Sequence, residues 1–188
     1  AKYPNICRHV HLPLQSGSDR ILKAMNRHYT RADYMLLVQK LRAAMPDVSL
    51  TTDIIVGFPG ETEEDFQDTL DLVEKVRYDS AFTFIYSVRK ETPAEKYEDQ
   101  IPEDVKHDRF NRLIEAIHRI QEEKSAAYQD KVLKVLVDGP SKTNSEVLTG
   151  RTDSNMTVDF PGDESLIGKI ADVKIVKAQT FSLYGELV

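Results

Sequence analysis

Residues that could form a ligand site stand in or directly after several apolar runs of the sequence. They are Gln15, Ser16, Asp53, Gly57, Pro59, Gly60, Glu61, Tyr86, Ser87 and Arg89. Runs of β-branched residues such as Ile54-Ile55-Val56 are typical of strands buried in a parallel sheet. The carboxyl ends of parallel strands lie along one edge of the sheet, and ligands bind there. We therefore expect these residues to share one site. For Gln15 and Ser16 the alternative is that they only satisfy the hydrogen bonds of the turn.

Asp53 is a carboxylate inside an apolar run. A buried acid needs a partner, because an unpaired charge is expensive to remove from water. Two interpretations stay open. Asp53 forms an ion pair with an arginine of the fold, or it holds a hydroxyl or an amine of a ligand.

The turn Gly57-Phe58-Pro59-Gly60 would let a ligand approach the backbone, with Glu61 beside it. It is not a phosphate-binding P-loop, because no Gly-Lys-Ser or Gly-Lys-Thr follows. The alternative is a strand-to-helix turn that needs glycine only for its backbone angles.

His9 and His11 are two residues apart on a predicted strand, so they share one of its faces. A zinc site would need further ligands to complete it. The pattern favours a packed or hydrogen-bonded histidine pair over a metal site.

The composition is that of an ordinary water-soluble chain. Of 188 residues, 40% are hydrophobic and 30% are charged, and no apolar run approaches the ~20 residues of a membrane span. Cys7 is the one cysteine, which excludes a disulfide framework and an all-cysteine metal site within the chain. The net charge of −6 predicts no general electrostatic attraction to nucleic acid. A cytoplasmic protein fits these features.

Strand and helix patterns alternate through residues 1–130. Strands are predicted near 8–14, 51–56 and 81–87, and helices at 19–26, from Thr30 to Pro46, at 62–77 and at 103–129. Ser18, Thr30 and Thr62 are the expected N-caps. This alternation predicts right-handed parallel βα units, with too few strands to close a barrel.

The helix after Thr30 should bury an apolar stripe at i, i+3, i+4 and i+7. Its members are Tyr34, Leu37, Val38 and Leu41.

The pattern changes at residue 131. Five short strands are predicted in 131–188, which suggests a small antiparallel β-barrel of the OB kind. This second domain holds seven Lys or Arg and eight Asp or Glu, so its charge alone does not argue for RNA binding.

Several runs resemble the radical S-adenosylmethionine methylthiotransferases. They are His11-Leu-Pro-Leu-Gln-Ser-Gly-Ser18, Met25-Asn-Arg-His-Tyr-Thr-Arg31, Thr52-Asp-Ile-Ile-Val-Gly-Phe-Pro-Gly-Glu-Thr62 and Tyr86-Ser-Val-Arg89. Gly150-Arg-Thr-Asp-Ser-Asn155 and Phe160-Pro-Gly-Asp-Glu-Ser-Leu-Ile-Gly168 resemble the TRAM domain that ends these enzymes. One departure is Lys90-Glu-Thr-Pro93, where the family often has Pro-Gly-Thr-Pro.

The resemblance implies an α/β fold: half of a parallel (β/α)6 radical barrel over 1–130, then an OB-like TRAM barrel over 131–188. It implies a partial S-adenosylmethionine site. The residues it assigns there are Gln15, Ser16, Asp53, Gly57, Pro59, Gly60, Glu61, Phe84, Tyr86 and Ser87. For substrate and RNA contacts it suggests Arg89, Lys142, Arg151 and Asn155.

In the family, one iron–sulfur cluster cleaves S-adenosylmethionine to a radical and a second cluster supplies sulfur. Two 4Fe-4S clusters are thus expected in a full-length protein and none in this chain, which lacks both sets of cysteines. The chain begins Ala-Lys-Tyr-Pro, so a missing N-terminal half of the same polypeptide is an expected partner.

The function implied is the addition of a methylthio group to C2 of N6-isopentenyladenosine beside the anticodon of tRNA, with this chain inactive alone. Two alternatives remain: a methylthiotransferase of the same family that acts on a ribosomal protein, and a non-catalytic RNA-binding protein. The unpaired edges of a half barrel also suggest a homodimer.

Overall fold

The computed structural model describes residues 2–3, 5–142, 144 and 146–188. The chain divides into two compact units. One unit, called the α/β unit here, consists of Val10–Pro46 and Leu50–Ile120. The other contains Gln121–Val188 together with the N-terminal segment up to His9 and Asp47–Ser49.

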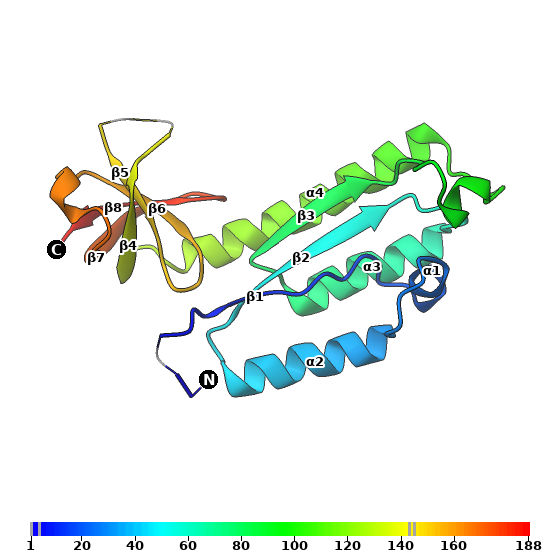
Figure 1. Ribbon diagram of the computed structural model, residues 1–188, viewed down its shortest axis with the longest axis horizontal. Coiled ribbons are helices and arrows are strands. Elements are labelled where there is room, and N and C mark those ends of the chain that lie inside the picture. The colour runs from blue at the N-terminus through cyan, green and yellow to red at the C-terminus, as the bar shows by residue number, and fades with distance from the viewer. Residues whose placement is uncertain (1, 4, 143, 145) are drawn as a thin grey trace. The chain divides into compact units, whose positions relative to one another are not determined.

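The α/β unit alternates strands and helices (Figure 1). Its elements, some of which extend past its limits, are β1 (His9–His11), α1 (Asp19–Ala24), α2 (Arg31–Ala44), β2 (Ser49–Val56), α3 (Glu63–Val76), β3 (Ser80–Ile85), a 3-10 turn (Pro93–Lys96) and α4 (Glu103–Ala126). The strand order is β1-β2-β3, and β2 and β3 pair in parallel with Asp53 opposite Phe82 and Ile55 opposite Phe84. The predicted alternation of elements is confirmed.

Local sequence signals set the helix starts. The side chains of Thr30 and Thr62 each accept a hydrogen bond from the backbone N–H three residues on, at Asp33 and Asp65. The carboxylates of these two aspartates accept in turn from the backbone N–H of the threonine, so both helices begin with a complete capping box. Ser18 caps α1 by accepting from Ile21. At the other end of α3, Arg77 takes the left-handed conformation (φ 51°) that ends the helix.

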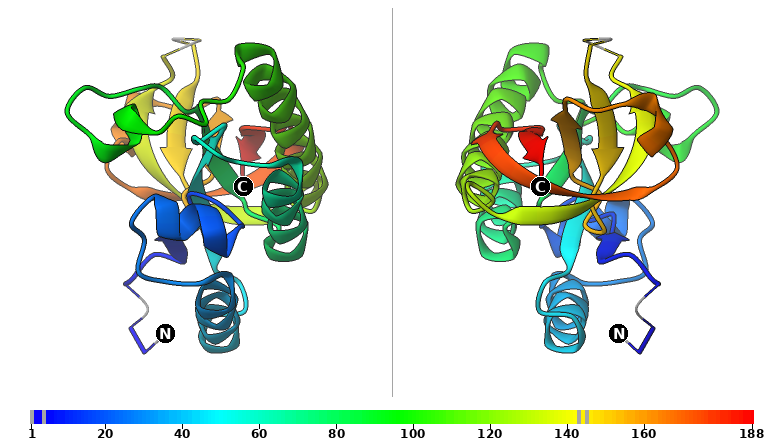
Figure 2. Two further views of the ribbon diagram at one scale, coloured as in Figure 1. Left: turned by 90° about the vertical axis from the view of Figure 1, so that its right-hand side faces the viewer. Right: turned by 90° about the vertical axis from the view of Figure 1, so that its left-hand side faces the viewer.

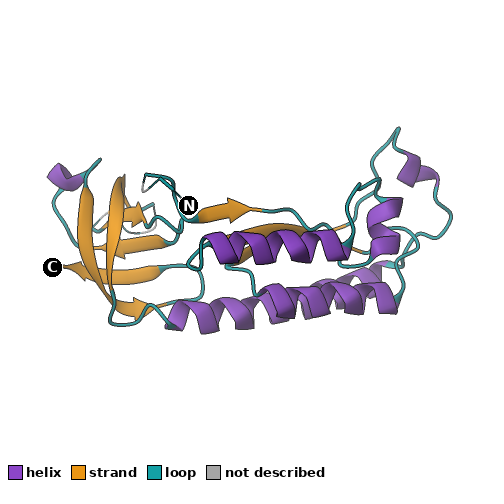
Figure 3. Cartoon of the chain, turned by 90° about the horizontal axis from the view of Figure 1, so that it is seen from below, coloured by secondary structure: helices purple, strands orange, loops and turns teal. Residues whose placement is uncertain are grey.

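The two faces of the sheet differ. Leu50, Ile54 and Val56 are fully buried on the side where α2, α3 and α4 lie (Figures 2 and 3). On the opposite side, Phe82 and Phe84 of β3 are 59% and 51% exposed. The side chains of alternate residues therefore form a helix-free face of the sheet, on which Asp53 also lies.

The predicted apolar stripe of α2 is wrong at one position. Tyr34 and Val38 are buried, but Leu37 is 42% exposed. The buried face of α2 is instead anchored by a hydrogen bond between the hydroxyls of Tyr34 and Tyr78 (2.9 Å), two aromatic residues that are themselves buried.

The second unit is a closed five-stranded barrel with order β4-β5-β6-β8-β7 (Figure 2, right). The strands are β4 (Val132–Pro140), β5 (Leu148–Arg151), β6 (Thr157–Phe160), β7 (Ile170–Ala178) and β8 (Leu183–Leu187), with a 3-10 turn at Glu164–Leu166. Alternate residues fill the core, among them Val135, Val158, Phe160, Val173 and Ile175. The prediction of an antiparallel barrel needs one correction, because β6 and β8 pair in parallel. A closed ring with an odd number of strands cannot be antiparallel throughout, so one neighbouring pair must be parallel.

None of the helices among the described residues is both long and apolar enough to span a membrane.

Candidate functional site

Gln15 and Asp53 are joined through the backbone at the carboxyl side of β1. The Gln15 N–H donates to the carbonyl of Asp53 (2.8 Å), and the Gln15 carbonyl accepts from Ile55 (2.9 Å). Gln15 itself is in the left-handed region (φ 67°), which ends the strand and redirects the chain. The residues predicted to share the site are therefore adjacent here.

The glycine turn after β2 is held tightly against α4. Gly57 has φ 74°, and a Cβ at this position would come within 2.5 Å of the Lys106 Cγ. Gly60 also has a positive φ (77°), but a Cβ there would find its nearest neighbour 3.8 Å away. Gly57 is thus required both by its backbone angles and by the closeness of α4.

Glu61 points into the protein. Its carboxylate accepts from the Gly57 N–H (3.1 Å) and from Nη1 of Arg109 (2.9 Å), whose Nη1 also donates to the Glu61 carbonyl (3.0 Å). Burial raises the pKa of Glu61, and the bonds from Gly57 and Arg109 oppose that rise. These contacts give Glu61 a structural part in fixing the turn; a contact with a cofactor stays a prediction.

The segment Ser16-Gly17-Ser18 docks on α3. Gly17 N–H donates to Thr69 Oγ1 (2.9 Å), and Ser18 Oγ donates to Asp65 Oδ1 (2.6 Å). Ser16 is 1% exposed, and its hydroxyl lies 3.5 Å from that of Thr69. Ser16 therefore faces the helix side of the sheet, where it holds the loop.

Tyr86 closes the edge of the site beside the glycine turn. Its N–H donates to the carbonyl of Val56 (2.8 Å), its ring meets that of Phe58 edge-on (5.1 Å between centroids), and Lys106 Nζ lies 5.9 Å from the ring centre. The Tyr86 hydroxyl is buried, yet it has no hydrogen-bond partner among the residues that the structure describes. A buried polar atom without a partner is costly, so a group from a ligand would satisfy it.

Among the described residues, Asp53 is paired with a histidine and with no arginine. Its Oδ2 lies 3.4 Å from Nε2 of His11, while Nδ1 of the same ring is 2.9 Å from Thr51 Oγ1. The ring of His11 also meets Phe82 edge-on at 6.2 Å. His11 is the residue that sequence reasoning missed as part of the site; its place on the same strand face as His9 was the available signal.

Phe84 lies on β3, Ser87 and Arg89 lie in the segment that follows this strand, and all three are exposed. Within the described residues, no group of three or more His, Cys, Asp or Glu side chains could hold a metal ion.

The helix-free face carries exposed aromatic rings and the carboxylate of Asp53, a mixture of apolar surface and polar groups of the kind that lines small-molecule sites. A contact of Asp53, Phe84 or Tyr86 with S-adenosylmethionine stays a prediction, whereas Glu61 and Ser16 have structural contacts in the loops.

Three of the four residues predicted to contact substrate or RNA lie in the unit that contains the barrel, and the fourth, Arg89, lies in the α/β unit. Arg151 Nη1 donates to Asn155 Oδ1 (3.0 Å), and its Nε is 3.6 Å from the Asp138 carboxylate. The structure thus brings Arg151 and Asn155 together. Lys142 is exposed in the β4–β5 connection.

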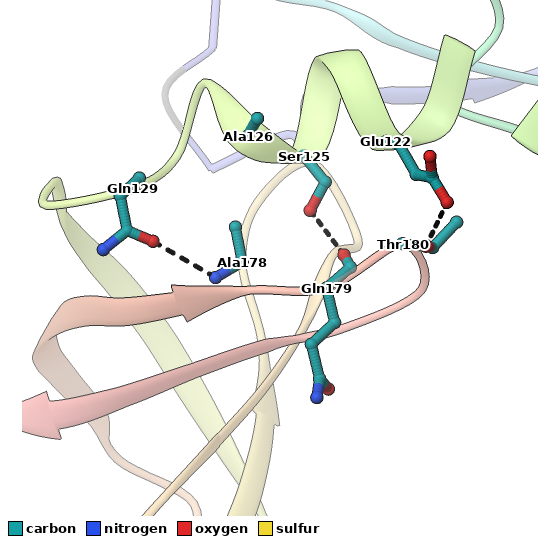
Figure 4. Close-up of a pocket in the computed structure, with 7 residues that line it drawn as sticks. All are labelled: Glu122, Ser125, Ala126, Gln129, Ala178, Gln179 and Thr180. Carbon is teal, nitrogen blue, oxygen red and sulfur yellow. Dashed lines mark hydrogen bonds between the residues drawn. The ribbon is translucent and has the colours of Figure 1, made fainter. Parts of the chain in front are cut away.

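A shallow pocket of about 470 Å³ lies between the end of α4 and the β7–β8 hairpin (Figure 4). Ser125 Oγ donates to the carbonyl of Gln179 (2.5 Å), and Thr180 Oγ1 donates to Glu122 Oε1 (3.2 Å). These bonds fasten the barrel to the last turns of the helix.

Two segments of the chain match known protein families. Residues 1–73 match the radical SAM superfamily and residues 126–188 match the TRAM domain. The tRNA-2-methylthio-N(6)-dimethylallyladenosine synthase of Clostridium perfringens is 62% identical over 97% of this chain, and that of Alkaliphilus oremlandii is 57% identical over all of it. The chain spans 41% and 40% of the lengths of these two relatives.

Among solved structures, coproporphyrinogen III oxidase from Escherichia coli, a radical SAM enzyme, matches 78% of this chain and 41% of its own. The TM-score is 0.53 at 14% identity, which shows a common fold and nothing about the reaction. By its sequence, the chain is a homologue of part of these synthases, with a segment that matches the radical SAM superfamily followed by one that matches the TRAM domain.

Proposed function

We propose that this chain is part of a tRNA-modifying enzyme that adds a methylthio group to C2 of N6-isopentenyladenosine beside the anticodon. The observation that carries the proposal is the 57–62% identity to relatives named for that product, over almost the whole chain. S-adenosylmethionine, when bound, would supply the methyl group and the radical chemistry.

In this proposal the α/β unit is half of a (β/α)6 barrel and its helix-free face lines the reaction chamber. Asp53, Phe84 and Tyr86 contact the cofactor or the substrate base, while Gln15, Ser16 and Glu61 fix the loops. Gly57, Pro59 and Gly60 shape the turn, and Ser87 and Arg89 extend the rim toward the substrate. The two 4Fe-4S clusters would be held by residues outside this chain.

The exposed rings of Phe82 and Phe84 support a substrate with an apolar substituent. Each is more than half exposed on the face that carries Asp53. A branched five-carbon group on N6 of adenosine would bury these rings, at roughly 25 cal/mol for each Å² of apolar surface removed from water.

The TRAM barrel would hold the tRNA through Arg151, Asn155 and Lys142. Its near-neutral charge favours a few specific contacts over bulk attraction. A cytoplasmic location goes with a tRNA substrate.

The test is performed with the full-length enzyme. Mass spectrometry of nucleosides from tRNA, after reaction with S-adenosylmethionine under reducing anaerobic conditions, should show the methylthio product. Modification of a ribosomal protein instead would favour the other branch of the family. Binding of tRNA with neither modification would favour a non-catalytic RNA-binding protein.

The edges of the three-stranded sheet should be paired by the N-terminal half of the same polypeptide. In the isolated chain we propose that they pair with a second copy. Sedimentation across a dilution series should show a dimer; a monomer at all concentrations, with β1 and β3 protected from hydrogen exchange, would contradict this.

A further inference from the structure

His11 contacts the carboxylate of Asp53 on the helix-free face of the sheet. Nε2 of its imidazole is 3.4 Å from Asp53 Oδ2, within ion-pair distance but too long for a good hydrogen bond. Both side chains are partly exposed, 39% for His11 and 29% for Asp53, so a ligand can reach them.

The other nitrogen of the ring is held by Thr51. Its Oγ1 is 2.9 Å from Nδ1, and Thr51 is itself 8% exposed in the middle of β2. In the tautomer that carries its hydrogen on Nε2, that hydrogen is directed at Asp53 and Nδ1 accepts from the threonine hydroxyl. The contact with Thr51 thus orients the imidazole.

Only one oxygen of Asp53 is engaged by this arrangement. Among the described residues, Oδ1 has no hydrogen-bond partner. A carboxylate with one oxygen held and the other open is suited to accept from a hydroxyl, and acidic residues hold ribose hydroxyls in this way in nucleotide-binding folds.

Phe82, the residue opposite Asp53 on the neighbouring strand, adds an aromatic surface to the site. Phe82 lies opposite Asp53 in the parallel register, is 59% exposed, and meets the His11 ring edge-on. An aromatic surface for a base beside a carboxylate for its sugar is a combination that a nucleoside can use, and the two come from neighbouring strands.

We propose that His11 is a positioning residue that orients Asp53 to accept a hydrogen bond from a ribose hydroxyl of a bound nucleoside. Two sources share this chemistry: the ribose of the sulfonium cofactor and the ribose of the adenosine that is modified. The inference rests on the proposed function, since it deepens the same site.

The test measures equilibrium binding to the full-length enzyme by calorimetry, without turnover. One probe is S-adenosylhomocysteine with its 2′-deoxy and 3′-deoxy analogues. The other is an anticodon stem-loop containing N6-isopentenyladenosine, with and without the 2′-hydroxyl of that nucleoside. The variants are His11→Leu, His11→Gln, which keeps a donor near the position of Nε2, and Thr51→Val with Thr51→Ser as its matched control.

We expect His11→Leu to weaken one of the two probes about 5- to 10-fold, as for the loss of one well-placed hydrogen bond. His11→Gln and Thr51→Ser should stay within about 3-fold of the unchanged protein. The analogue that lacks the recognised hydroxyl should bind all variants with equal affinity. The probe whose affinity falls in His11→Leu identifies which of the two riboses is held. Circular dichroism and thermal unfolding verify that the variants fold.

Two results would overturn the inference. One is that His11→Leu binds both probes as tightly as the unchanged protein; the other is an equal loss with the deoxy analogues, which would make His11 merely structural. Neither result touches the proposed function, whereas failure of the unchanged enzyme to bind either probe would reject both.

Discussion

Arg109 of α4 and Glu61, at the end of the glycine turn, form a buried ion pair with 2.9 Å between Nη1 and Oε1. Their side chains are 6% and 2% exposed, and the same carboxylate accepts from the Gly57 N–H. The long helix therefore fixes the path of the backbone at the carboxyl end of β2, where the family resemblance expects the cofactor.

Replacing Glu61 by Ala should destabilise the α/β unit by about 3–5 kcal/mol, because Arg109 would be left buried without its main partner. Urea-induced unfolding measures the change. Glu63→Ala is the matched control: it removes another acid bound to Arg109, but that side chain is 49% exposed, so about 1 kcal/mol or less is expected. Equal losses would contradict the structural importance of the buried pair.

The two glycines of the turn should respond differently to alanine. Gly57→Ala combines a positive φ with a 2.5 Å approach to Lys106, so a loss of about 2–4 kcal/mol is expected. Gly60→Ala carries the backbone strain alone, about 1 kcal/mol, because its surroundings leave room for a methyl group. Thermal unfolding of the two variants measures this difference, and a greater loss for Gly60→Ala would show that the packing against α4 is unimportant.

Asp65 should contribute to acid unfolding. Burial acts to raise its pKa, but bonds from Arg20, Ser18 and Thr62 outweigh this and lower the pKa to about 2. Between that value and the ordinary 3.8, the unfolded chain binds a proton that the folded chain does not, so stability falls as the pH falls through this window.

Asp65→Asn should therefore cost roughly 1–3 kcal/mol at pH 7 and flatten the dependence of stability on pH between about 4 and 2. Urea unfolding at a series of pH values tests this. An unchanged slope in that range would mean that other carboxylates dominate acid unfolding.

The sequence was informative wherever structure is decided by near neighbours. Thr30 and Thr62 predicted helix starts because a cap and its partner are three residues apart, and the capping boxes are present. The strand-to-helix order followed from periodicity in the same way. The five strands of the barrel were also visible as separate short runs.

What could not be predicted depends on register between distant segments. His11 meets Asp53 across 42 positions of sequence, and a shift of one residue would turn either side chain to the other face. The parallel β6–β8 pair and the exposure of Leu37 are likewise set by which elements pack together. The pairing of Glu61 with Arg109, over 48 positions, gave no local signal either.

Arg151 is the last residue for which the structure makes a sharp prediction. Its guanidinium lies 3.6 Å from the Asp138 carboxylate, and both side chains are about half exposed. Such an exposed pair is worth about 1 kcal/mol or less, so a phosphate can displace the carboxylate. If Arg151 contacts tRNA, Asp138 competes with the RNA for it.

Asp138→Asn in the full-length protein should consequently tighten tRNA binding by about 2- to 5-fold at low salt. Arg151→Ala should weaken binding and reduce the salt slope by about one phosphate contact. In the double variant, Asp138→Asn should bring little gain, because the residue it releases is gone. Asp153→Asn controls for simple loss of negative charge in the neighbouring β5–β6 loop. Fluorescence anisotropy at several salt concentrations gives both the affinity for tRNA and its salt slope. If Asp153→Asn tightens tRNA binding as much as Asp138→Asn does, or if Asp138→Asn tightens it equally when Arg151 is absent, then Asp138 acts through the general electrostatic field and not through this pair.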